Sequence, residues 1–160
     1  DNFNYEYNLK YEIILNENSL KNNLSIHNNS KYPFTFDMLY HNYFKINLQD
    51  FKCNSFSNKK FYNQLNDKNE YDYNLLKIDN EIDRIYDNIN EVIFYSNSNE
   101  IKLESNSNFM VLWNPWIQKS KLLKDFGDEE FKNMVCFEPG IKYEINPNED
   151  FIFWQKIIIQ

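Results

Sequence analysis

The first fifteen residues alternate between apolar and polar side chains. Apolar residues occupy every odd position from Phe3 to Leu15, and Asn, Glu or Lys stand between them until Ile14. Successive side chains of a strand point to opposite faces, so this period of two predicts a strand with one buried face. The regular pattern also argues against disorder, which is a common property of chains this rich in asparagine.

Similar patterns predict further strands along the chain. Leu20, Leu24 and Ile26 predict a second strand that ends at residues 28–30, and alternation from Phe34 to Tyr43 predicts a third. Between about residues 47 and 80 the alternation is lost, and the sequence predicts polar connections that contain a few short groups of apolar residues. Strand patterns then return in six segments, which are Val92–Tyr95, Ile101–Leu103, Phe109–Trp113, Val135–Glu138, Ile141–Ile145 and Phe151–Ile159.

A single segment has the pattern of a helix. Residues 115–126 begin with Pro115, which suits a first helical turn, and Gly127 suits the position just past the end. Many short strands with one short helix predict an all-β fold, an antiparallel sandwich or barrel. The chain shows no internal repeat and no second domain.

Composition and charge exclude several classes of protein. The 160 residues include 28 Asn and 16 Lys but one Arg, two Gly and no Ala, a bias that we attribute to an A/T-rich genome. The net charge of −7 leaves no basic face for nucleic acid, and no apolar run reaches the 18 residues of a membrane span. With no visible signal peptide and two cysteines that we expect to be buried thiols, Cys53 and Cys136, we predict a cytoplasmic protein.

Three polar residues are candidates for chemistry, and each also has a structural interpretation. His41 lies on a predicted strand among aromatic residues, where a histidine is more often structural than catalytic. Glu138 ends an apolar stretch; it is either a buried carboxylate kept for a function or a residue that turns outward at Pro139. Asp83 lies between Ile82 and Arg84, where a surface salt bridge is the ordinary expectation.

The sequence indicates no metal or cofactor site. Asp79, Glu81 and Asp83 resemble the start of a calcium loop, but Arg84 and Asn90 replace the required glycine and bidentate glutamate. Gly-rich phosphate loops and the His/Cys spacing of zinc sites are also missing. We therefore predict that the protein needs neither a metal nor a cofactor.

Four segments together resemble one known family. Residues 111–116 (VLWNPW) and 134–140 (MVCFEPG) resemble the C-terminal signature of the hexose-6-phosphate mutarotases. These enzymes are also called glucose-6-phosphate 1-epimerases and belong to the aldose 1-epimerase superfamily. Upstream, residues 34–44, which contain FTF and HNYF, and residues 81–86 (EIDRIY) are similar to two further motifs of the family. The order and rough spacing agree along nearly the whole chain.

The resemblance implies a fold, an activity and three site residues. The fold is a large antiparallel β-sandwich of galactose-mutarotase type. The activity is the interconversion of α and β anomers of a hexose 6-phosphate, glucose 6-phosphate in particular, with Glu138 as base, His41 as acid and Asp83 binding sugar hydroxyls. A mutarotase for unphosphorylated aldoses and a non-catalytic carbohydrate-binding or interaction module remain the alternatives. If Asp83 lines the pocket, its neighbour Arg84 points to the opposite face of the strand.

Two departures from the family pattern shape these expectations. The family's Gly-Leu-x-Gly turn corresponds to residues 53–58, which contain no glycine. The resemblance also implies that residues 1–160 are the C-terminal part of a single sandwich domain, without the N-terminal half that carries the phosphate-binding arginines. We expect such a segment not to be a self-sufficient active unit, and the complete protein to be a monomer.

Overall fold

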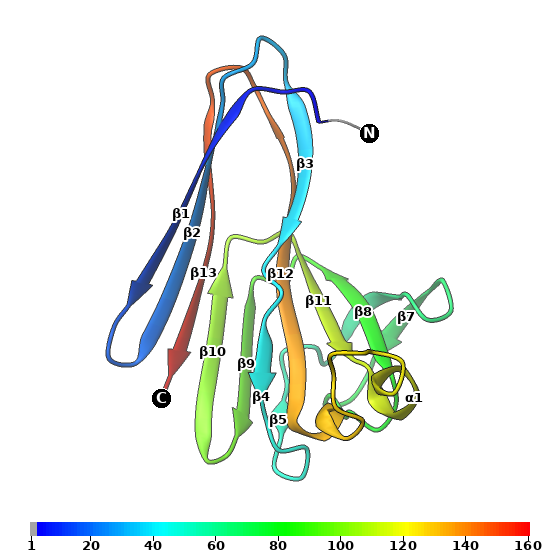
Figure 1. The fold of residues 1–160 in the computed structure, drawn as a ribbon. Helices are drawn as coiled ribbons and strands as arrows, with labels where there is room; N and C mark the ends of the chain where they lie inside the picture. Colours follow the sequence, from blue (N-terminus) through cyan, green and yellow to red (C-terminus); the bar gives the residue numbers. More distant parts are fainter. Residues whose placement is uncertain (1–2) are drawn as a thin grey trace.

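The computed structural model, which describes residues 3–160, consists of two antiparallel sheets packed face to face (Figure 1). This arrangement confirms the all-β antiparallel sandwich. The first sheet has the order β1 (Tyr7–Leu15), β2 (Ser19–Asn28), β13 (Asp150–Ile159), β10 (Asn99–Ser105), β9 (Glu91–Ser96) and β5 (Lys52–Cys53). The second has the order β3 (Phe34–Leu39), β12 (Met134–Ile145), β11 (Phe109–Asn114), β8 (Ile82–Asp87), β6 (Lys59–Asn63) and β7 (Lys68–Asp72), and β4 (Tyr43–Lys45) also pairs with β12.

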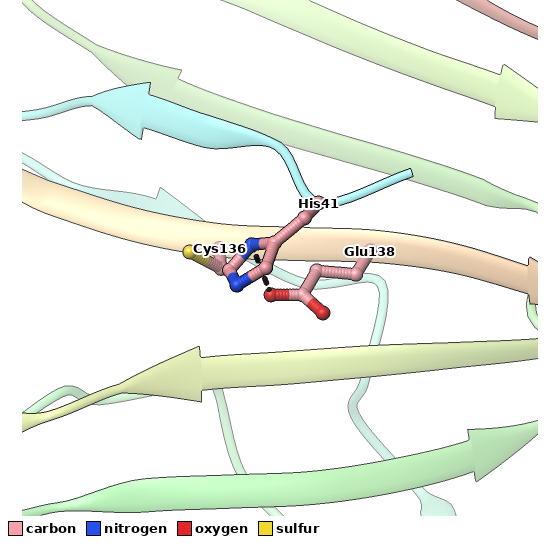
Figure 2. Close-up of side chains that lie close together, drawn as sticks. All are labelled: His41, Cys136 and Glu138. Carbon is pink, nitrogen blue, oxygen red and sulfur yellow. Dashed lines mark ion pairs between the residues drawn. The ribbon is translucent and has the colours of Figure 1, made fainter. Parts of the chain in front are cut away.

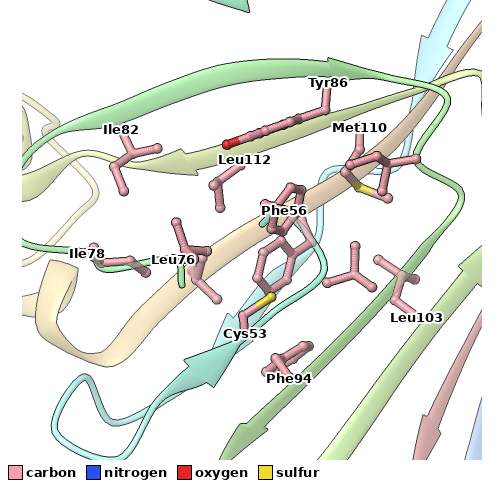
Figure 3. Close-up of a cluster of buried hydrophobic side chains, with 14 of the residues drawn as sticks. Cys53, Phe56, Leu76, Ile78, Ile82, Tyr86, Phe94, Leu103, Met110 and Leu112 are labelled. Atoms are coloured by element: carbon pink, nitrogen blue, oxygen red, sulfur yellow. The ribbon is translucent and has the colours of Figure 1, made fainter. Parts of the chain in front are cut away.

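The main hydrophobic core lies between the two sheets (Figure 3). Alternate residues of each strand point inward, so Phe94 of β9 meets Phe137 of β12 with ring centroids 5.1 Å apart. Tyr86 and Phe56 are fully buried in the same cluster. Cys53 is also a free, buried thiol of this core, as its sequence context predicted. A packed interior of this kind fixes which face of each strand remains outside.

Several element boundaries differ from the sequence-based predictions. The stretch from 47 to 80, expected to be mostly connections, contains the short strands β5, β6 and β7. The two strands expected on either side of Pro139 are one continuous strand, β12. The helix expected over residues 115–126 is wrong in extent, because α1 covers only Trp116–Ser120 and a 3-10 turn follows at Glu130–Asn133.

Strand β1 is present, but the prediction that its apolar face is buried is wrong. Leu9 is 56% exposed and Ile13 is 60% exposed, and Tyr11 and Leu15 are exposed as well. β1 is the edge strand of its sheet, beyond β2. Phe34 of β3 and Tyr40 after it meet Tyr7 and Tyr11. Leu9, Ile13 and Leu15 stay exposed, so a strand with the pattern of a core strand presents much of that pattern to solvent.

Within residues 3–160, no helix has the length and the apolar character needed to cross a membrane.

We predict that Gly140→Ala destabilises the protein more than Gly127→Ala. A Cβ at residue 140 would lie 2.1 Å from Cε2 of Phe109, the residue opposite it on β11, so the ring must move. A Cβ at residue 127 meets the flexible side chain of Glu130 at 3.0 Å. Urea unfolding should show a loss of about 1–3 kcal/mol for Gly140→Ala and about 0.5 kcal/mol or less for Gly127→Ala. Equal losses would show that Phe109 does not pack on the glycine.

Candidate active site

The candidate site lies on the outer face of the second sheet, opposite the core. Phe137 of β12 points into the core, so its neighbours Cys136 and Glu138 point outward. The same alternation puts Asp83 of β8 and Trp113 of β11 on this outer face. Three adjacent strands therefore bring the predicted site residues of the C-terminal half to one surface.

The prediction that His41 lies on a strand is wrong, because the residue reaches the same surface from a break in the sheet. It lies between β3 and β4, both of which pair with β12. The register on each side of the break, Gly140 opposite Leu39 and Cys136 opposite Tyr43, places His41 directly opposite Glu138. Cross-strand neighbours in register have their side chains in reach of each other.

His41 and Glu138 are in direct contact. Nδ1 of His41 lies 2.8 Å from Oε1 of Glu138, and Figure 2 marks this contact with a dashed line. The side chain of His41 is 51% exposed, whereas that of Glu138 is only 7% exposed. The imidazole ring also stacks on Tyr43 at a centroid distance of 4.7 Å and meets Trp113 edge-on. The histidine therefore closes over a carboxylate that the sheet has already removed from water.

The residues beside His41 hold this break in place. Asn42 and Gln155 exchange two side-chain hydrogen bonds of 2.7 and 3.0 Å, and Asn42 also donates to the carbonyl of Phe137. The hydroxyl of Tyr40 donates to the carbonyl of Phe153 on β13. Because both neighbours of His41 are fixed toward the opposite sheet, the histidine itself points outward.

A pocket of about 310 Å³ surrounds the pair. Asp83 contributes its carboxylate to the wall, as expected, and Arg84 on the opposite face pairs with Asp72 at 2.9 Å. The prediction that Arg84 lies outside the pocket is therefore confirmed. The lining residues are Leu39, His41, Gln64, Asp83, Ile85, Phe109, Val111, Trp113 and Glu138.

Sequence reasoning missed Gln64. Its side-chain amide donates to Oδ1 of Asp83 at 2.5 Å, and its backbone N–H donates to the carbonyl of Asp83. Lys119 lies on the other side, with Nζ 3.9 Å from Oδ2 of Asp83 and 3.5 Å from Oε1 of Glu81. Gln64 follows a strand that the polar stretch did not reveal, so no sequence pattern pointed to it.

Burial shifts the proton affinities of both members of the pair. It raises the pKa of Glu138 to about 7, helped by the charge of Asp83 and opposed by a hydrogen bond from the Cys136 thiol. Burial also lowers the pKa of His41. Burial therefore disfavours the charged form of each group, and the pKa of Glu138 rises to the range in which a histidine ordinarily titrates.

We predict that the Glu138 carboxyl titrates near pH 7. Because burial disfavours the charged form, its protonated infrared band should grow as the pH falls through about 7. Glu138→Gln should remove this band, whereas Glu144→Gln, which changes an exposed carboxyl of the same strand, should keep it. Cys136→Ala should raise the midpoint because a hydrogen bond to the carboxylate is lost. A midpoint near the ordinary value of 4.5 would contradict the prediction.

Comparison with known proteins shows which family the chain belongs to. The family model for aldose 1-epimerase matches residues 1–155, so the chain belongs to the aldose 1-epimerase family. A protein of Cenchrus ciliaris named "putative glucose-6-phosphate 1-epimerase" is 26% identical over 115 residues, which are 68% of this chain and 35% of that protein.

Solved structures share the fold. A "putative mutarotase" from Salmonella typhimurium superimposes with a TM-score of 0.85 at 17% identity, covering 97% of this chain and 54% of that one. A galactose mutarotase-like protein from Clostridium acetobutylicum gives a TM-score of 0.72 at 16% identity, covering 99% and 57%. The chain thus spans about half the length of these two structures and about a third of the plant relative.

Proposed function

We propose that this chain carries the acid–base pair of a mutarotase that interconverts the α and β anomers of a hexose 6-phosphate, glucose 6-phosphate in particular. The observation that supports it is the contact between His41 and Glu138 at 2.8 Å in a pocket that Asp83 also lines. Membership of the aldose 1-epimerase family and the name of the plant relative point to the same reaction.

The reaction needs a base at the anomeric hydroxyl and an acid at the ring oxygen of the sugar. Ionised Glu138 removes the proton of the anomeric hydroxyl, and protonated His41 gives a proton to the ring oxygen as the C1–O5 bond breaks. The aldehyde rotates about C1–C2, and the same groups then act in reverse to close the ring. General acid or base catalysis by each group accelerates such a reaction by about 10²–10⁴-fold. The sugar must separate the two side chains, and the exposed imidazole is the one free to move.

Asp83 has a supporting role in this proposal. A carboxylate accepts hydrogen bonds from sugar hydroxyls. The carboxylate of Asp83 is held in position by Gln64 on one side and Lys119 on the other. The faces of Trp113 and Phe109 supply apolar surface in the same pocket. The described pocket therefore combines an acid, a base, a hydroxyl ligand and an apolar wall.

The pocket lining described above includes no lysine or arginine. The single arginine, Arg84, is on the other face and is paired with Asp72. A dianionic phosphate group requires cationic donors. We propose that they come from residues beyond 1–160. A lining without cationic side chains also favours a second candidate function, that of a mutarotase for unphosphorylated aldoses.

We predict that Glu138→Gln lowers the anomer exchange rate of glucose 6-phosphate by at least about 100-fold in the complete protein. The amide cannot accept the anomeric proton. Exchange NMR spectroscopy measures the rate, and the Glu144→Gln variant, which changes an exposed carboxyl, should match the wild type. Equal rates for the wild type and Glu138→Gln would overturn the assignment of the base.

The same assay separates the alternatives. Faster exchange of glucose or galactose than of glucose 6-phosphate would support the unphosphorylated substrates. Sugar binding without acceleration over buffer would support a non-catalytic carbohydrate-binding module.

We also propose that residues 1–160 are the C-terminal part of one sandwich domain, and that the complete protein acts as a cytoplasmic monomer. The exposed apolar face of β1 supports the first part of this proposal, because contiguous apolar surface of this kind is normally covered. Leu9 and Ile13 have the pattern of core residues, and further residues of the same domain would bury them.

We predict opposite effects of Ile13→Lys in the short segment and in the complete protein. In residues 1–160 alone the lysine should reduce aggregation, because it interrupts an exposed apolar face on an edge strand. In the complete protein the lysine should lower the free energy of unfolding by about 2 kcal/mol or more, because we propose that the isoleucine is buried there. Light scattering and urea unfolding measure the two effects. Asn8→Lys, on the polar face, should change neither, and a soluble, active segment 1–160 would contradict the proposal.

A further inference from the structure

Three potential metal ligands converge beside the proposed catalytic pair. Nδ1 or Nε2 of His41, Sγ of Cys136 and a carboxylate oxygen of Glu138 all lie within 4.8 Å of one another (Figure 2). Cys136 and Glu138 are alternate residues of β12 and so share a face, and His41 is in register with Glu138 across the break. The acid–base chemistry uses two of these groups and leaves the thiol unexplained.

We propose that His41, Cys136 and Glu138 form a binding site for a zinc ion, and that zinc inhibits the enzyme by occupying its acid and base together. The site itself depends only on the geometry. The inhibition rests on the proposed function.

The donor set fits zinc in both chemistry and geometry. One imidazole nitrogen, one thiolate and one carboxylate oxygen are its three usual protein ligands. Tetrahedral bonds of about 2.0–2.3 Å place such ligand atoms about 3.3–3.8 Å apart. The His41–Glu138 contact of 2.8 Å must therefore open slightly and the longest separation must close. The half-exposed imidazole can make this adjustment, and the fourth position then faces the pocket.

The replacement of protons by zinc at these three side chains is balanced in charge. With two titratable protons distributed over the thiol, the imidazole and the carboxyl, the group of three is neutral before zinc binds. A divalent zinc ion that binds the thiolate, the carboxylate and the neutral imidazole again gives a neutral group, and two protons leave to solvent. Asp83 adds negative charge at the same pocket, which favours a cation at its mouth.

The consequence for the proposed reaction is direct. A metal-bound carboxylate cannot accept the anomeric proton, and a metal-bound imidazole nitrogen cannot hold a proton for the ring oxygen. Zinc and sugar would therefore compete for the pocket.

The test uses the complete protein with Co²⁺ as a spectroscopic probe for zinc. Wild-type protein should show a thiolate-to-cobalt charge-transfer band that zinc displaces, and X-ray absorption of the zinc form should show one sulfur at about 2.3 Å. Cys136→Ala should abolish the band and weaken zinc binding by at least about 100-fold. The matched control Cys53→Ala, which removes the other buried thiol, should retain both. Absence of the band or of the sulfur ligand in wild-type protein would overturn the site.

A second measurement separates this site from the catalytic proposal. In anomer exchange assays zinc should inhibit the wild type competitively, and the Cys53→Ala variant should be inhibited at the same concentrations. Zinc that binds through Cys136 without slowing exchange would overturn the inhibitory role. A metal-free protein without exchange activity would overturn the proposed function alone, since the cobalt spectrum tests the site in either case.

Discussion

The arrangement of the site depends on one missing hydrogen-bond donor, that of Pro139. Tyr40 donates its N–H to the carbonyl of Pro139 at 3.0 Å, but proline has no N–H to return the bond. The carbonyl of Tyr40 instead accepts from the N–H of Asn42, two residues on. This tight turn has His41 at its centre and lifts it out of the sheet. A proline in a central strand is rare, and here it produces the gap between β3 and β4.

The remaining polar groups around the gap are hydrogen-bonded by Asn42 of the gap itself and by Gln155 of the opposite sheet. Asn42 caps the carbonyl of Phe137 and pairs with Gln155, which is itself buried. Buried polar groups are costly unless they are fully bonded, so this amide pair has one stable arrangement. The sandwich thus fixes the backbone around His41, while the imidazole itself stays half-exposed. Rigid support and a mobile side chain are both needed if a sugar is to enter between acid and base.

The sequence predicted the class of fold, and indicated residues that the structure brings together, better than it predicted local geometry. Periodicity found most strands because sheet pairing leaves a period of two. Periodicity failed at Pro139, because a proline usually ends a strand. The pairing of β12 with β11 and β3 on its two sides shows that this strand continues through the proline. Periodicity also failed for β1, because an apolar pattern records what a face is suited to contact and not what covers it. Gln64 was out of reach, since its bond to Asp83 joins segments with no shared pattern.

The abundance of asparagine has a structural consequence beyond codon usage. Among residues 3–160, four of the seven non-glycine residues with positive φ are asparagines, at positions 58, 88, 97 and 148, and neither glycine adopts a positive φ. Asparagine tolerates the left-handed region better than other residues with a Cβ. Asn58, with φ of 57°, lies in the segment where the family has a Gly-Leu-x-Gly turn. A chain with few glycines can therefore form turns of this kind, because asparagine takes the left-handed conformation that glycine would otherwise supply.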